Sequence, residues 1–163
     1  FVQLFDCWYA ALQYTHFAQC VEYLDNGVIG VPMVDISTCA YELEGLHTAR
    51  SGIENISLIK RLHALAELLP SSIRHIIFPA NYSPFLGRIA DSRNYQTHGR
   101  LKVKNKNPFT PLDELDGARR CLEFLRVLLL LELGVPVKVL ESLYAAKGRW
   151  LFSYKKKPLA YIG

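Results

Sequence analysis

Apolar residues recur every three or four positions along almost the whole chain, and this spacing limits the fold more than any other feature. Leu62, Leu65 and Leu69 show it in one stretch, with the period of a helix that buries one face. There is no alternating, strand-like pattern of useful length and no internal repeat. The sequence therefore predicts an all-α fold, an up-and-down bundle of five to six helices.

Glycine and proline residues mark the ends of the predicted helices. Gly52 and Gly134 are placed to stop two of them, and Pro70 ends a third. The predicted helices cover residues 4–24, 34–50, 56–69, 84–101, 112–133 and 136–147. The inward-facing side chains expected of the long helix over 112–133 are Leu115, Ala118, Leu122, Leu125 and Leu129. Residues 70–83 are expected to be mostly loop, with at most a short helical turn over 73–78.

The chain has 163 residues, which is the size of one ordinary domain. Half of the residues are hydrophobic and 21% are charged, a composition that excludes an intrinsically disordered chain. We predict a helical domain over residues 1–147 and a basic, aromatic tail over residues 148–163. The longest apolar run, Val127 to Leu131, is far shorter than the about 20 residues of a membrane span.

The start of the chain is unusual for a complete protein. It begins at Phe1, and Met33 is its only methionine. No Lys or Arg precedes Arg50, which excludes the charged region of a signal peptide. We therefore expect the chain to be part of a longer protein with a further N-terminal region.

The cysteines indicate a reducing compartment. They are Cys7, Cys20, Cys39 and Cys121, and no two of them form a C-x-x-C pair. A zinc ribbon or a redox-active pair therefore has no support, and isolated cysteines in apolar surroundings are usually core residues. We expect a cytoplasmic protein that needs no metal and no cofactor.

Charge is distributed unevenly. Residues 1–49 carry six acidic residues and no Lys or Arg, whereas residues 50–163 carry all 19 basic residues and nine acidic ones. One basic cluster consists of Arg88, Arg93, Arg100, Lys102, Lys104 and Lys106. A second consists of Lys147, Arg149, Lys155, Lys156 and Lys157. Clustered positive charge gives sequence-independent affinity for phosphates, although a solvated basic face is the commoner meaning.

Three residues inside the first basic cluster have the chemistry of a catalytic site. Asn94 and His98 are four positions apart, about 40° from each other on an ideal helix, and Arg93 is about 140° from His98. One helix therefore does not assemble a compact site by itself. Two copies that meet across a two-fold axis would bring the three side chains together.

Such a set suits cleavage of RNA without a metal, because the 2′-hydroxyl of the substrate can attack the neighbouring phosphate. A histidine can move protons near neutral pH, and an arginine presents a planar fork to two phosphate oxygens. The sequence has no evident cluster of metal-binding Asp, Glu and His residues, which disfavours a two-metal nuclease. The structural alternative is that Arg93 pairs with Asp91 or with glutamates, and that His98 is a cation at the end of a helix.

The segment Ser92 to Gly99 (SRNYQTHG) resembles the R-N-x-x-x-H signature of the HEPN superfamily of small helical domains, many of which are ribonucleases. Three flanking segments resemble the Apea-like subgroup. Residues 5–9 are similar to the aromatic start of the subgroup's first helix (Phe5 to Tyr9). Residues 41–50 are similar to an L-E-x-x-H element (Tyr41 to Arg50), and residues 112–136 are similar to a long leucine-rich helix (Leu112 to Pro136). The similarity covers roughly residues 5–145.

The resemblance implies roles for individual residues. Arg93 would stabilise the transition state, Asn94 would orient groups, and His98 would transfer protons. Glu44 aligns with an acidic residue of related domains and is placed to orient Arg93, whereas His47 is as readily a packed core histidine. The family further implies a homodimer with a composite site, a role as toxin or antiphage effector, and a position at the C-terminus of a longer protein.

These observations predict a metal-independent endoribonuclease that cuts single-stranded RNA. Its phosphate contacts would come from Arg100, Lys102, Lys104 and Lys106. Tyr95 or Phe109 would stack on unpaired bases, unless they pack in the core or at its rim. The first alternative is a non-catalytic HEPN module that dimerises or binds nucleotides or RNA. The second is an unrelated helical bundle in which Arg93 and His98 are buried and apart.

Overall fold

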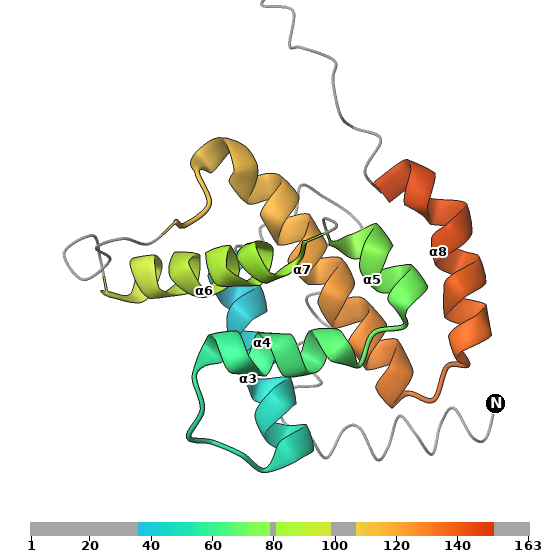
Figure 1. The fold of residues 1–163 in the computed structure, drawn as a ribbon, viewed down its shortest axis with the longest axis horizontal. Helices are drawn as coiled ribbons and strands as arrows, with labels where there is room; N and C mark the ends of the chain where they lie inside the picture. The colour runs from blue at the N-terminus through green and yellow to red at the C-terminus, as the bar shows by residue number, and fades with distance from the viewer. Residues whose placement is uncertain (1–35, 79–80, 99–106, 152–163) are drawn as a thin grey trace, which may run out of the picture.

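The computed structural model describes residues 36–78, 81–98 and 107–151, which form six helices with no strand among them. The helices are α3 (Ile36–Ser51), α4 (Leu58–Glu67), α5 (Ser71–Ile77), α6 (Ser83–His98), α7 (Pro111–Glu132) and α8 (Val137–Leu151) (Figure 1). The predicted all-α class is confirmed. The helix expected over residues 4–24 lies outside the described residues.

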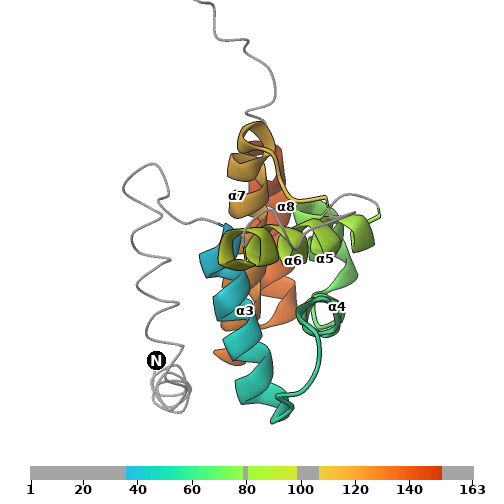
Figure 2. The ribbon, with the colours of Figure 1, turned by 90° about the vertical axis from the view of Figure 1, so that its left-hand side faces the viewer.

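Helix α3 is the element on which the candidate site is built. It packs against α4, α6 and α7, and α4 also contacts α6. In Figure 1, α4 and α6 both lie across α3, and the turned view of Figure 2 shows α3 and α7 side by side. Side chains from α3, α4 and α6 can therefore meet at one place.

The leucine-rich helix α7 is buried on several sides, because α3 and α5 both pack against it. Of the five side chains predicted to face inward, Ala118, Leu122, Leu125 and Leu129 are buried. Leu115 is 45% exposed, which corrects that expectation. It belongs to the first turns of α7, which extend beyond the helices that cover the middle of α7 (Figure 1). None of the described helices is long and apolar enough to cross a membrane.

A buried polar contact joins α8 to α7. The hydroxyl of Tyr144 donates a hydrogen bond to Glu123 Oε2 over 2.6 Å, and Arg126 binds the other oxygen of Glu123. Burial, followed by the negative charge of Glu123, raises the pKa of Tyr144, so the phenol stays protonated and remains a donor. Helix α8 runs to Leu151, past its predicted end at residue 147, because a single glycine such as Gly148 weakens a helix by about 1 kcal/mol without ending it.

Helix α5 lies in the segment that the sequence favoured as mostly loop. Pro70 ends the preceding helix as predicted, but its carbonyl also accepts hydrogen bonds from the backbone N–H groups of Ile73 and Arg74, at 3.0 and 2.9 Å. Ile73 and Ile77 are one helical turn apart and both are fully buried. The same proline therefore separates two helices, and the apolar pair fixes the second one against the core.

Two of the cysteines, Cys39 and Cys121, are thiols buried in the core. Burial raises the pKa of the Cys121 thiol well above its usual value, with a smaller contribution from Cys39. Both cysteines therefore act as small apolar side chains, as expected. Cys7 and Cys20 lie outside the described residues.

Candidate active site

Helix α6 carries the predicted motif on its C-terminal half. Its apolar residues Leu86 and Ile89 are fully buried where α6 packs on α3 and α4. Arg93 follows Ile89 by one turn, so its side chain leaves the core at the edge of the α3 interface and is 29% exposed. Asn94 comes next on the helix, and His98 is its last residue.

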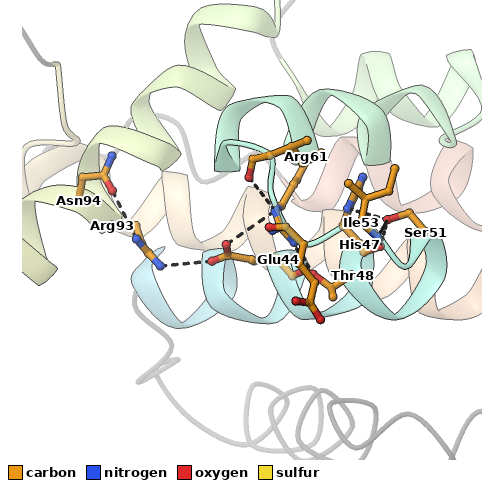
Figure 3. Close-up of polar contacts among 10 residues, drawn as sticks. Glu44, His47, Thr48, Ser51, Ile53, Arg61, Arg93 and Asn94 are labelled. Atoms are coloured by element: carbon orange, nitrogen blue, oxygen red, sulfur yellow. Dashed lines mark hydrogen bonds and ion pairs between the residues drawn. The ribbon is translucent and has the colours of Figure 1, made fainter.

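Arg93 is ion-paired with Glu44 of α3. Its Nη2 donates a hydrogen bond to Glu44 Oε2 over 3.2 Å, and the Glu44 side chain is 28% exposed (Figure 3). Two residues that are 49 positions apart in the sequence thus meet at the edge of the bundle. A carboxylate that holds one nitrogen of a guanidinium fixes the plane of the fork while leaving other N–H groups available.

A second arginine, Arg61 of α4, approaches the other oxygen of Glu44, and sequence reasoning missed it. Its Nε lies 3.7 Å from Glu44 Oε1, and its side chain is only 5% exposed. A signal was present in the sequence. Arg61 follows Leu58 by three positions and precedes Leu65 by four, so it occupies the apolar face of its helix. We refer to Arg61, Glu44 and Arg93 together as the Arg–Glu–Arg cluster.

The other predicted site residues are only partly placed by the structure. Asn94 Oδ1 accepts a long hydrogen bond of 3.5 Å from Arg93 Nη1, and Tyr95 is half-buried on the same helix. For His98 the structure describes the helical backbone position. Arg100, Lys102, Lys104 and Lys106 lie outside the described residues. Within the described ranges, no three His, Cys, Asp or Glu side chains gather as ligands of a metal would.

The segment that returns toward α7 is attached to the side of α6. Asp91 Oδ2 accepts a hydrogen bond from the backbone N–H of Asn107 over 2.9 Å, and Ser92 Oγ accepts one from Phe109 over 2.8 Å. Arg88, a member of the basic cluster, pairs with Asp113 over 2.6 Å and lies over the ring of Phe109. Phe109 thus packs against Arg88, and Arg88 holds the pKa of Asp113 below its usual value.

His47 lies one helical turn beyond Glu44 and is a packed histidine. Its Nδ1 is 3.2 Å from the hydroxyl of Ser51, which in turn donates to the His47 carbonyl over 2.8 Å (Figure 3). Burial, and then the positive charge of Arg61, lowers the pKa of His47. The side chain is therefore neutral near pH 7 and adds no charge to the cluster beside it.

This lowered pKa predicts that His47 makes the fold sensitive to acid. The unfolded chain binds the proton more readily than the folded one, so stability is fully present above about pH 6.5 and falls as the pH drops below it. We expect the free energy of unfolding to fall more between about pH 7.5 and pH 5.5 in the parent chain than in His47→Gln. Urea unfolding at both pH values measures it, with His75→Gln as an exposed control. Equal losses in the parent and in His47→Gln would contradict the prediction.

The comparison with known families shows the family of the chain. A sequence model of the Apea-like HEPN family matches residues 41–138, more than half of the chain. The chain therefore belongs to the Apea-like HEPN family. The match includes Glu44, Arg61 and Arg93. HEPN domains commonly bind RNA and dimerise, and they are often ribonucleases. Searches of curated proteins and of solved structures return no match.

Proposed function

We propose that the chain is a metal-independent endoribonuclease that cleaves single-stranded RNA. The observation that carries the proposal is the pairing of Arg93 with Glu44 at 3.2 Å, five positions before His98 on α6, in a chain of the Apea-like HEPN family. The pair presents a partly exposed, oriented guanidinium on the same helix as His98. Its chemistry suits a phosphodiester that is attacked by its own 2′-hydroxyl.

The reaction needs two proton transfers and one charge stabilisation. The 2′-oxygen forms a bond to phosphorus as its proton leaves, and the bond from phosphorus to the 5′-oxygen breaks as that oxygen gains a proton. In this proposal His98 moves the protons, Arg93 binds the phosphoryl oxygens, and Glu44 fixes Arg93. Asn94 orients the reacting groups. The products are a 2′,3′-cyclic phosphate and a 5′-hydroxyl.

The remaining assignments belong to the same proposal. Tyr95 stacks on a base, and the phosphates on either side of the cleaved bond contact Arg100, Lys102, Lys104 and Lys106. Two copies of the domain form a homodimer in which α6 of each copy completes a composite site. The protein acts in the cytoplasm as a toxin or antiphage effector, with no metal or cofactor and under the control of a further N-terminal region.

A second candidate is a HEPN module that dimerises or binds nucleotides or RNA without cleaving them. The specific observation in its favour is that Arg93 already has a carboxylate partner in Glu44, as a purely structural arginine would. The two candidates differ in turnover, so a cleavage assay separates them.

The test is the cleavage of an end-labelled, unstructured RNA by the purified chain in EDTA. We expect cleavage into fragments that end in a cyclic phosphate, and no cleavage of a DNA strand of the same sequence, because DNA lacks the attacking 2′-hydroxyl. Cleavage of the DNA, or cleavage that requires an added divalent cation, would contradict the mechanism. Absence of RNA cleavage at every pH tested would favour the binding module.

A further inference from the structure

Arg61 is a buried cation that is fixed from several directions. Its Nε donates to the carbonyl of Ile56 over 3.2 Å, and its Nη2 donates to the carbonyl of Glu54. Its Nη1 contacts the hydroxyl of Thr48 and lies 3.5 Å from the Glu44 carbonyl. These bonds hold the guanidinium in place between α3 and the segment that leads into α4 (Figure 3).

The fixed position of Arg61 decides how Glu44 can face Arg93. Glu44 Oε1 lies 3.7 Å from Arg61, and Glu44 Oε2 lies 3.2 Å from Arg93. Each oxygen therefore has its own cation, and Arg93 contacts one oxygen instead of two. A carboxylate without a second cation would be free to turn both oxygens to Arg93 and form the stronger bidentate pair.

The charges of the cluster lead to the same conclusion. Two arginines and one glutamate leave the Arg–Glu–Arg cluster with one unbalanced positive charge. Arg61 is buried, whereas the Arg93 side chain is 29% exposed, so the accessible part of this charge is at Arg93. The described geometry thus makes Arg93, the arginine of the α6 motif, the accessible cation of the cluster.

We propose that Arg61 is a positioning residue that shares Glu44 with Arg93 and so keeps Arg93 available to an RNA phosphate. The inference rests on the proposed function, since it names what sets the phosphate affinity of that site. Arg61 acts through Glu44 and does not touch the RNA itself. Without its charge, Glu44 pairs fully with Arg93 and competes with the phosphate for the guanidinium.

The experiment measures binding of an unstructured 2′-O-methyl RNA oligonucleotide by fluorescence anisotropy at low salt. This probe has no free 2′-hydroxyl and is not cleaved, so the result is independent of turnover. We expect Arg61→Gln, which keeps amide hydrogen bonding without the charge, to weaken binding about five- to tenfold. Arg61→Lys keeps the charge and should bind within about twofold of the parent chain, although both variants lose buried hydrogen bonds.

Two further variants separate charge sharing from a structural role. Arg50→Met removes one exposed positive charge elsewhere on α3 and reports the effect of net charge alone. In a Glu44→Gln background, Arg61→Gln should have no further effect on binding, because there is no carboxylate left to share. The proposal would be overturned if Arg61→Lys and Arg61→Gln lost the same affinity for the oligonucleotide. It would also be overturned if Arg61→Gln lost the same affinity in the parent chain and in the Glu44→Gln background.

The proposal stays testable if Arg61→Gln does not fold. Glu44→Gln alone then decides, because removal of the competing carboxylate should make the oligonucleotide bind more tightly. Weaker binding by Glu44→Gln, or no binding by the parent chain, would overturn the inference. If the parent chain and the variants bind the probe as expected but the parent chain cleaves no RNA, the inference about Arg61 stands and the proposed nuclease activity fails.

Discussion

The His98→Ala variant should cleave RNA some hundredfold to ten-thousandfold more slowly than the parent chain, because proton transfer by a positioned histidine accounts for a factor of this size. His98 is the last residue of α6, five positions beyond Arg93, so its loss leaves the pair of Arg93 and Glu44 in place. Substrate affinity should change much less than the rate. Single-turnover cleavage of end-labelled RNA in EDTA measures both.

The matched control for this prediction is His75→Ala. His75 is an exposed histidine on α5, where its Nδ1 contacts the carbonyl of Ser71. The His75→Ala variant should cleave RNA at the parental rate, because α5 packs on α7 and α8 and carries none of the motif. If the cleavage rate of His98→Ala were within about threefold of that of His75→Ala, His98 would have no role in the mechanism.

Phe124→Ala should produce the largest loss of stability, about 3–5 kcal/mol in the free energy of unfolding. Phe124 is fully buried in α7, and its ring meets that of Phe78 edge-on with 5.0 Å between centroids. Truncation removes this contact and leaves a cavity in the middle of the bundle. Because domains of this size are stabilised by only about 5–15 kcal/mol, the loss is a large part of the total.

Denaturant unfolding of Phe124→Ala and of Leu115→Ala measures this effect on one helix. Leu115 is 45% exposed, so its truncation should cost well under about 1 kcal/mol. Similar losses for the two variants would mean that the centre of α7 is not the centre of the core.

Much of the helical part of the fold was predictable from the sequence, and the reasons are local. The period of Leu62, Leu65 and Leu69 and the stop at Gly52, which adopts a positive φ of 67°, depend on neighbouring residues only. Helix α5 was underestimated because its seven residues are too few to show a period. Its helical state depends on burial of Ile73 and Ile77 against other helices.

The candidate site was predictable in part, for a different reason. Arg93 was found from its chemistry within the basic cluster and Glu44 through the resemblance, and their contact across 49 positions could not have come from spacing alone. Arg61 was missed because its role arises where α3, α4 and the segment between them meet. An arginine on the apolar face of a helix is the local sign of such a residue. The roles of Asn94 and His98 stay predictions.

The attachment of Asn107 and Phe109 to the side of α6 has a consequence for how this domain can change. The chain that leaves α6 after His98 is fastened again to the same helix at Asp91 and Ser92. Doubling the length of a connection between two fixed points adds only about 0.6 kcal/mol to its closure cost. Insertions after His98 should therefore be tolerated. Evolution or protein engineering can therefore change the number of lysines in this connection without changing the helix that carries the motif.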